Sequence, residues 1–198
     1  MPPISEIRLY ISGLWLLVKG NPAGFRCLDI SDRGMMRSFW AIVWSLPAIA
    51  SSWIWWRLAY LQGLPEGQSL GGIFFLRMGM LEAANWLLPL VLAGVLALLM
   101  GFGRHFPAIV LITNWLSVPF AYIYGVLSLM LIALPGLTAI IALLWLAAIL
   151  SLIIALTRIF KLLLGDQTLM VATLTMVLIV PSLLVSDVLE KFLGVYPN

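Results

Sequence analysis

Long apolar stretches alternate with short polar segments along this chain. A membrane-crossing helix needs about 20 predominantly apolar residues to span roughly 30 Å of hydrocarbon. By that criterion the pattern predicts five spans, at about residues 38–58, 80–101, 108–132, 137–157 and 168–186. Residues 37–198 are therefore predicted to form one domain, an all-α polytopic transmembrane helix bundle.

Breaks in the apolar pattern mark the ends of the predicted spans. The uncharged stretch 108–157 is too long for one helix across a bilayer, and a Leu-Pro-Gly sequence at 134–136 divides it. Segment 64–72 is rich in Gly, Pro and Ser and is predicted to be a loop. Segment 73–82 carries two charged residues, so we expect it to be an interfacial lead-in to the second span. Pro47 is predicted to kink the first span because it removes a backbone donor.

Residues 1–36 are the only sizeable extramembrane segment in this prediction. Their apolar side chains recur at the three-to-four-residue spacing of one helix face, as shown by Ile4, Ile7, Ile11, Leu14, Trp15 and Val18. Asn21-Pro22 is expected to stop that helix. We predict an amphipathic helix lying in the cytoplasmic membrane interface, followed by a juxtamembrane hinge. A partner-binding helix would show the same pattern.

Polar residues gather in the hinge just before the first span, namely Asp29, Ser31, Asp32, Arg33 and Arg37. Ser31 or Asp32 is suited to cap the helix that becomes that span, because its oxygen can accept from unpaired amides of the first turn. Arg33 and Arg37 are four residues apart and are expected to face lipid phosphates. Gly34 is expected to leave room for the interfacial helix. The pattern favours a structural hinge, with a partner or ligand surface as the alternative.

The composition supports a membrane protein. Hydrophobic residues make up 63% of the chain and charged residues 10%, against about 45–50% and about 25% in soluble proteins. A globular domain of 198 residues could not bury that much apolar surface, so the solvent must include lipid. Nine Trp residues strengthen this interpretation, because amphipathic rings favour membrane interfaces.

The Lys and Arg residues are distributed unequally between the two sides of the predicted bundle. The N-terminal side carries eight of them: Arg8, Lys19, Arg26, Arg33, Arg37, Arg104, Arg158 and Lys161. The other side carries three: Arg57, Arg77 and Lys191. Because such an excess marks the cytoplasmic side, we predict a bacterial inner-membrane protein with a cytoplasmic N-terminus and a periplasmic C-terminus. No cleavable signal peptide is visible, so the first span is expected to act as an uncleaved anchor.

Small residues at four-residue spacing predict helix-packing faces. One face lies in the third predicted span and consists of Thr113, Ser117, Ala121 and Gly125. A second lies in the fourth span and consists of Ala147, Ser151 and Ala155. Small side chains let two backbones approach closely within a membrane. We expect internal helix contacts at both faces, in preference to a seam between copies of the chain.

A few polar residues inside the predicted spans form a candidate intramembrane site. Glu82 and Asn85 are three residues apart and close to Arg77, and Asn114 lies inside the third span. Such groups are costly in lipid and need a partner or a purpose. Glu82, Asn85 and Asn114 could form a proton or cation site. Alternatively, Glu82 pairs with Arg77 and the asparagines cross-link helices, which the pattern favours because a single carboxylate near a membrane edge is weak support for a transport path.

Other chemistry is sparse in the sequence. Cys27 is the only cysteine and His105 the only histidine, so we predict no disulfide, no metal site and no cofactor. No phosphate-binding loop or Gly-x-Ser-x-Gly elbow occurs, and we predict that the protein is not an enzyme. The basic residues adjoin apolar segments, so no nucleic-acid partner is expected. The expected partners are membrane lipids and another membrane protein or a second copy of this chain.

Two functional hypotheses follow. The first is a membrane-organising, scaffold or assembly-accessory protein that acts through helix packing with partners. The alternative is a small transporter or permease subunit that uses the polar site around Glu82, Asn85 and Asn114. A polar cavity reaching mid-membrane would favour transport, whereas a dry bundle would favour a scaffold.

Five predicted spans with short loops, after a cytoplasmic N-terminal segment, resemble the Yip-type family of Rab-interacting five-span membrane proteins and its bacterial relatives. This resemblance covers topology over about residues 37–190 and implies a role in membrane trafficking, which is that of the eukaryotic members. The segment DISDRGMMRSFWA, residues 29–41, also resembles the start of polytopic alphaproteobacterial membrane proteins of uncharacterised function. Neither resemblance implies catalytic residues.

Overall fold

The computed structural model describes residues 2–62 and 71–195, and all regular structure in those two ranges is helical. The α-helices there are α1 (Ile4–Val18), α2 (Asp32–Ser38), α3 (Ala41–Gln62), α4 (Ile73–Leu99), α5 (Phe106–Ala133), α6 (Thr138–Leu164) and α7 (Thr168–Leu193). Short 3-10 helices join several of them: η1 (Pro22–Cys27), η2 (Gly103–His105) and η3 (Pro135–Leu137). The predicted all-α class is confirmed for this part of the chain.

The five predicted spans fall on α3 to α7, and several of these helices extend beyond the predicted spans. Segment 73–82, the predicted interfacial lead-in, belongs to the same continuous helix as the second span, α4. α6 continues beyond its predicted end at residue 157, through Arg158 and Lys161. The sequence pattern stopped each span at the first charge, whereas long basic side chains at a helix end can reach out to water. Most of the predicted loop 64–72 lies outside the described residues.

Four helical segments of the described chain are long and apolar enough to cross a membrane: Ile73–Leu99, Gly103–Ala133, Pro135–Leu164 and Thr168–Leu193. This architecture is compatible with a multi-pass membrane protein. α3 is not in that set, although its 22 residues give a helix of about 33 Å at 1.5 Å per residue. Its serines, its internal Pro47 and its several Trp and Tyr residues make it less apolar than the other four.

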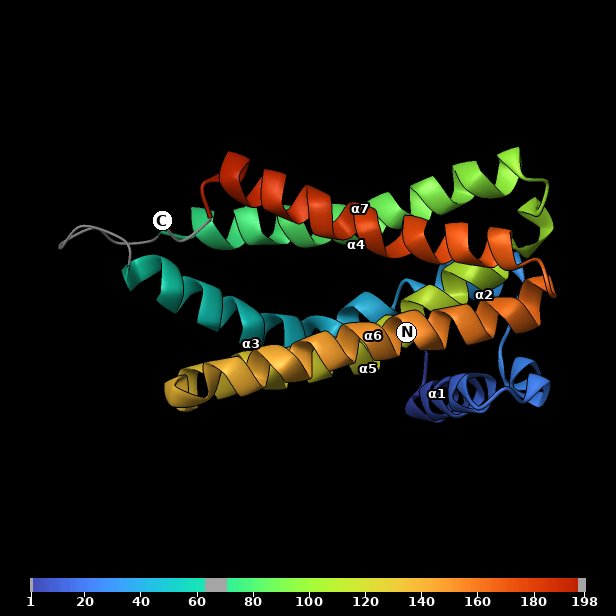
Figure 1. Cartoon of the computed structure of the whole chain (residues 1–198), viewed down its shortest axis with the longest axis horizontal. Coiled ribbons are helices and arrows are strands. Elements are labelled where there is room, and N and C mark those ends of the chain that lie inside the picture. The colour runs from blue at the N-terminus through green and yellow to red at the C-terminus, as the bar shows by residue number, and fades with distance from the viewer. Residues whose placement is uncertain (1, 63–70, 196–198) are drawn as a thin grey trace.

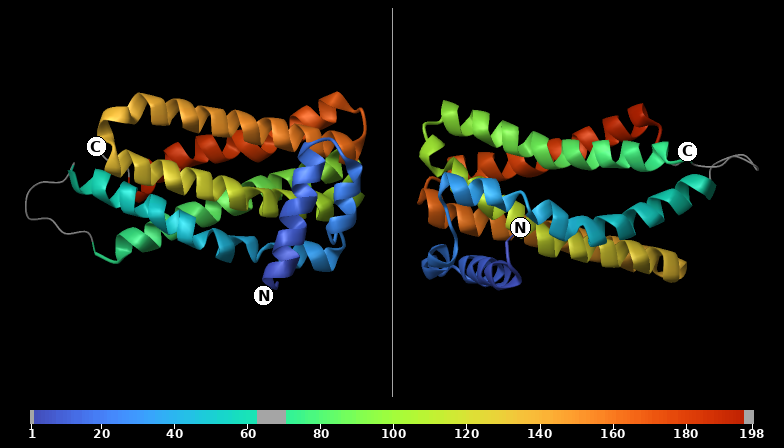
Figure 2. Two further views of the ribbon diagram at one scale, coloured as in Figure 1. Left: turned by 90° about the horizontal axis from the view of Figure 1, so that it is seen from below. Right: turned by 180° about the vertical axis from the view of Figure 1, so that it is seen from behind.

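The long helices form two groups that run along the same axis. α4 and α7 lie side by side in one group, and α3, α5 and α6 form the other (Figure 1). α6 also contacts α7 and so links the two groups. α1 lies across one end of the bundle, against α5 and α6 (Figure 2).

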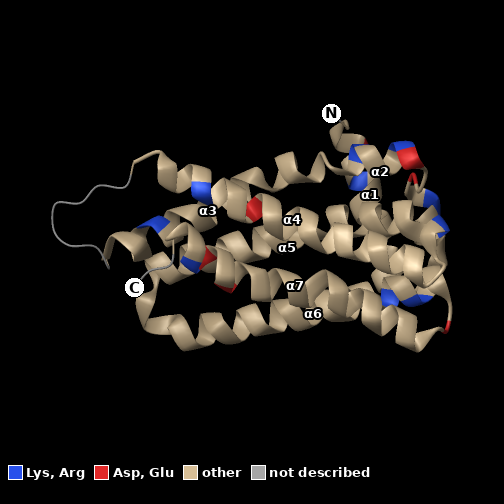
Figure 3. Cartoon of the chain, turned by 90° about the horizontal axis from the view of Figure 1, so that it is seen from above, with Lys and Arg blue, Asp and Glu red and all other residues tan. Residues whose placement is uncertain are grey.

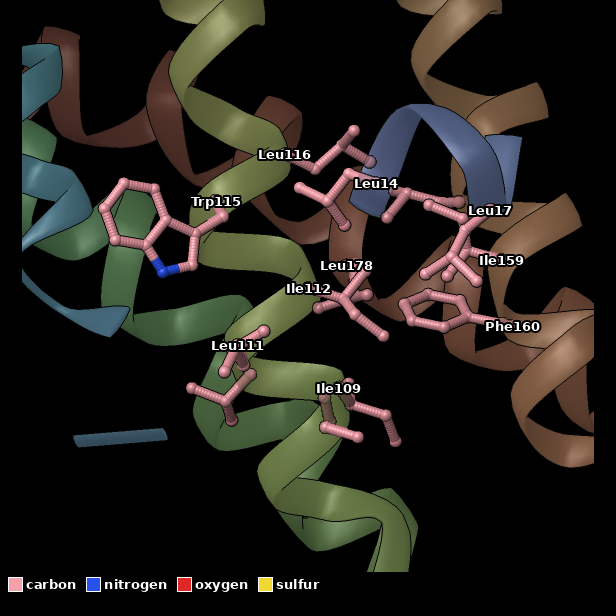
Figure 4. Packing of buried hydrophobic residues seen from close by; sticks show 14 of the residues in the cluster. Leu14, Leu17, Ile109, Leu111, Ile112, Trp115, Leu116, Ile159, Phe160 and Leu178 are labelled. Carbon is pink, nitrogen blue, oxygen red and sulfur yellow. The ribbon is translucent and has the colours of Figure 1, made fainter. Parts of the chain in front are cut away.

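α5 is the central helix of the main hydrophobic core. Its side chains Ile109, Leu111, Ile112 and Trp115 have no exposed surface. They belong to the same buried cluster as side chains of α1, α6 and α7 (Figure 4). The C-terminal end of α1 is also tied to α6, because the Arg158 guanidinium donates a hydrogen bond of 3.2 Å to the carbonyl of Val18. The N-terminal helix is thus part of the packed core.

α3 and α5 approach each other closely through small residues. The buried residues of α3 are all small: Ala41, Ser45, Ala48 and Ser52. Gly125 of α5 faces them, and a Cβ atom at that position would lie 2.6 Å from the Ser51 hydroxyl oxygen and 2.8 Å from the Ala48 carbonyl oxygen. There is no room for a side chain at Gly125. Close approach of this kind is the typical use of small residues between membrane helices.

The small-residue face of α6 has a different environment. Ala155 is buried, but Ala147 and Ser151 are exposed. The internal helix contact that we expected at Ala147 and Ser151 is therefore not formed within the described chain. The Ser151 hydroxyl donates to the Ala147 carbonyl of its own helix at 2.7 Å, which satisfies its hydrogen-bonding group without another helix.

Gly125→Leu should destabilise the protein by separating α3 from α5. Overpacking a tight contact typically costs about 1–3 kcal/mol, and we expect a loss in that range in denaturant unfolding of the detergent-solubilised protein. Gly136→Leu is the matched control, because a Cβ atom there meets nothing within 4 Å. Equal stability of the two variants would show that the close α3–α5 contact is not formed.

Candidate functional site

A cavity of about 600 Å³ lies in the middle of the bundle, and we call it the central cavity. Side chains of all five long helices, α3 to α7, line it. Most of the lining is apolar or aromatic, and its polar members include Glu82, Asn85, Asn114, Tyr124, Ser186 and Glu190. The bundle is therefore not packed solid, and the candidate polar residues Glu82, Asn85 and Asn114 share one space.

Glu82 is held by a different partner from the one expected. The indole N–H of Trp53 in α3 donates to its carboxylate at 3.4 Å. The ion pairs within the described ranges join Arg37 to Glu6, Lys161 to Asp166 and Lys191 to Asp187, so the predicted pairing of Glu82 with Arg77 was wrong. Residues five apart on a helix point in different directions, because only spacings of three or four share a face.

Asn85 links α4 to α7. The Ser186 hydroxyl donates to the side-chain carbonyl of Asn85 at 3.1 Å. Pro89 lies four residues further along α4 and has no N–H, so the backbone carbonyl of Asn85 lacks its usual helix donor. Both Asn85 and Pro89 line the central cavity. The backbone carbonyl of Asn85 therefore adds to the polarity that the side chains give this wall.

Asn114 joins three helices through its side chain. The indole N–H of Trp86 in α4 donates to its amide oxygen at 2.9 Å, and its amide nitrogen donates to the Ser38 hydroxyl of α2 at 2.8 Å. Ser38 in turn donates to the carbonyl of Met35 at 2.6 Å. Asn114 is only 1% exposed. Asn114 and Trp86 also line the central cavity, so this hydrogen-bonded group forms part of its wall.

The predicted packing face of α5 divides between two environments. Thr113, Ser117 and Ala121 line the central cavity, whereas Gly125 packs against α3. The hydroxyl oxygen of Thr113 is buried without a hydrogen-bond partner in the described structure. Small residues at regular spacing therefore mark both a helix contact and an open space, and the sequence spacing does not distinguish them.

The candidate hinge residues Ser31, Asp29 and Gly34 form the start of α2. The Ser31 hydroxyl accepts from the amide of Gly34 at 3.2 Å and donates to the carboxylate of Asp29 at 2.6 Å. Ser31 therefore caps α2, and not the first long helix, because α2 ends at Ser38 and α3 begins at Ala41. The backbone of Asp29 fills the space beside Gly34, so the expected approach of the interfacial helix at Gly34 was wrong.

Arg37 connects the hinge to α1. Its guanidinium lies 2.6 Å from the carboxylate of Glu6, an ion pair that the sequence pattern did not predict. The Tyr10 hydroxyl donates to the same carboxylate at 3.1 Å. Burial, helped by that hydrogen bond, raises the pKa of Tyr10 to about 12, and the residue stays a neutral donor. Asp32 and Arg33, the other two candidates, are exposed.

Comparison of the chain with protein-family models, with curated proteins and with solved structures finds no match. The class of protein rests on its architecture, a helical bundle with four segments able to cross a membrane. Within residues 2–62 and 71–195 no group of three or more His, Cys, Asp or Glu could hold a metal ion. The functional interpretation rests on the central cavity, because polar groups from several helices meet there.

Asn114→Ala should destabilise the fold more than Asn85→Ala. The first change leaves two partners, Trp86 and Ser38, without their bonds to Asn114, and should cost about 2–4 kcal/mol in the free energy of unfolding. Asn85→Ala removes one bond at a half-buried position and should cost about 1 kcal/mol. Denaturant titration of both variants in the same detergent measures the difference. A smaller effect for Asn114→Ala would contradict its role as the main cross-link.

Proposed function

We propose that the chain is a five-span protein of the bacterial inner membrane with α3 as its first span. α3 is long enough to cross, and it lies along α5, which is itself apolar enough to span a membrane. Most of the charged residues gather toward the two ends of the bundle (Figure 3). The Lys and Arg excess at the α1 and α2 end supports a cytoplasmic N-terminus, and five crossings then put the C-terminus in the periplasm.

α1 is proposed to lie in the cytoplasmic membrane interface. One side of this helix packs into the core, while Ile4, Leu9 and Trp15 are half or more exposed. An apolar outer face on a helix that crosses the end of the bundle fits the boundary between headgroups and acyl chains. The Lys19 ammonium lies 4.9 Å from the centre of the Trp15 ring, and both side chains are typical of that boundary.

We propose that the protein is a small permease or permease subunit, with the central cavity as its binding site. The observation that carries this proposal is that Glu82, Asn85 and Asn114 all line one cavity. Buried polar groups at membrane depth are tolerated where they line such a space. A volume of about 600 Å³ is within the range of small-molecule sites.

The helix arrangement also supports movement around the central cavity. α3 packs on α5 and α4 packs on α7, so the cavity lies between two helix pairs. Pro89 in α4 and Pro181 in α7 each remove a backbone hydrogen bond, which makes bending of this pair easier. Rocking of one pair against the other would open the cavity first to one side and then to the other, the usual basis of transport around a fixed site.

A membrane-organising or assembly-accessory role is the second candidate. It is favoured by the uncovered face of α6, where Ala147 and Ser151 would allow close approach of a helix from another membrane protein or a second copy. The resemblance to Yip-type five-span proteins belongs with this candidate. Both candidate functions are non-enzymatic.

Access of water to the central cavity separates the two candidates. In a Cys27→Ser background, Ser182→Cys places a thiol in the cavity lining, and Val180→Cys, also on α7, places one outside that lining. We expect a membrane-impermeant, charged methanethiosulfonate to modify Ser182→Cys much faster, because only the cavity admits a water-soluble reagent. If the protein is a permease, the reagent should label Ser182→Cys in sealed vesicles of either orientation, that is, from either side of the membrane.

Two results would contradict the permease proposal. Equal, slow labelling of the Ser182→Cys and Val180→Cys variants would mean that the cavity is closed to water. Fast labelling of Ser182→Cys from one side only would mean that the protein does not alternate between sides.

A further inference from the structure

The charged side chains that line the central cavity are all acidic. Glu82 enters from α4 and Glu190 from α7, and the lining contributed by the described residues contains no Lys or Arg. Basic residues are more numerous than acidic ones in the whole chain. The acidic lining is therefore a property of this cavity and not of the overall composition.

Glu82 has capacity for a further partner. Its hydrogen bond within the described structure is the 3.4 Å contact from the Trp53 indole, which is longer than the usual N–H···O distance of about 2.9–3.0 Å. None of the ion pairs formed by described residues includes it. Glu82 is partly buried, and a carboxylate withdrawn from water into an apolar setting is costly without an opposite charge. A bound cation would supply that charge.

The remaining lining suits a cation with an apolar body. Aromatic side chains line the cavity from four helices, namely Trp56, Trp86, Phe120, Tyr124 and Trp145. Aromatic ring faces attract cations, most strongly when both are away from water. The aliphatic part of the lining, which includes Leu81, Leu156 and Ile179, offers little to a hydrated metal ion but buries hydrocarbon well.

We propose that the central cavity binds a lipophilic organic cation, a molecule with one quaternary or delocalised positive charge on an aromatic or branched apolar body. Glu82 is its counter-ion, and the aromatic side chains contact its apolar body. This inference rests on the proposed function, because it names the substrate class of the same cavity. Glu190, the other acidic side chain of the lining, adds to the negative potential in the cavity.

The test uses two ions of nearly the same size and shape but opposite charge, tetraphenylphosphonium and tetraphenylborate. Their binding to the full chain in a neutral maltoside detergent is measured by isothermal titration calorimetry, with protein-free micelles as the blank. We expect tetraphenylphosphonium to bind and tetraphenylborate to bind at least about tenfold more weakly, which corresponds to 1.4 kcal/mol. This comparison needs no variant, so it does not depend on the folding of a mutant.

Glu82→Gln should weaken tetraphenylphosphonium binding by about tenfold or more, because it removes the counter-ion while keeping the side-chain shape. Asp187→Asn is the matched control. Asp187 is on α7, is paired with Lys191 at 2.8 Å and does not line the cavity, so its replacement should leave the affinity unchanged. Glu190→Gln, measured alongside, should weaken binding less than Glu82→Gln.

The failure of this inference is distinguishable from the failure of the proposed function. Equal affinity for the two ions, or an unchanged affinity in a folded Glu82→Gln variant, would overturn the cation assignment while leaving a cavity that binds small molecules. Absence of binding by either ion would also overturn the cation assignment. If the Ser182→Cys thiol was then closed to water as well, the permease proposal would fail with it.

Discussion

The hydrogen bonds of Asn114 are the interaction on which the rest of the arrangement depends. A buried amide in a largely apolar bundle is stable only if protein groups satisfy it. Trp86 and Ser38 do so, and this fixes α2, α4 and α5 relative to one another. Arg37, the residue before Ser38 in α2, pairs with Glu6 of α1. α2 therefore also fixes the position of α1. One buried side chain thus connects the N-terminal helix, through α2, to the wall of the central cavity.

The contacts between helices differ on the two sides of that cavity. α3 and α5 meet through small residues that leave no space at Gly125, whereas α4 and α7 are linked beside the cavity by the Asn85–Ser186 hydrogen bond. The cavity persists between these pairs because Thr113, Ser117 and Ala121 are too small to fill it. Polar groups from several helices can therefore face one another without being packed together, which is the physical basis of the proposed binding site.

The sequence predicted the long helices well, because apolar runs are a local signal. It also predicted a helix cap at Ser31 or Asp32, and Ser31 is a cap, but of the short helix α2 and not of the first long helix. It failed where partners are distant in the chain. Glu6 and Arg37 are separated by 31 residues, and Trp53 and Glu82 by 29, so no local spacing indicates either pair. The small-residue pattern of α5 was recognised, but whether a small residue faces a helix or a cavity depends on the neighbouring helices. The convergence of Glu82, Asn85 and Asn114 is likewise a product of the three-dimensional fold.

The central claim is that α3 crosses the membrane and completes the wall of the cavity. The location of the two termini tests it most directly, because five crossings place them on opposite sides and four crossings place them on the same side. Fusions of a green fluorescent protein, which fluoresces in the cytoplasm, and of an alkaline phosphatase, which is active in the periplasm, report each location. We predict a fluorescent N-terminal fusion and an active phosphatase at the C-terminus. Two termini on the same side would contradict a membrane-crossing α3, and with it the five-helix cavity.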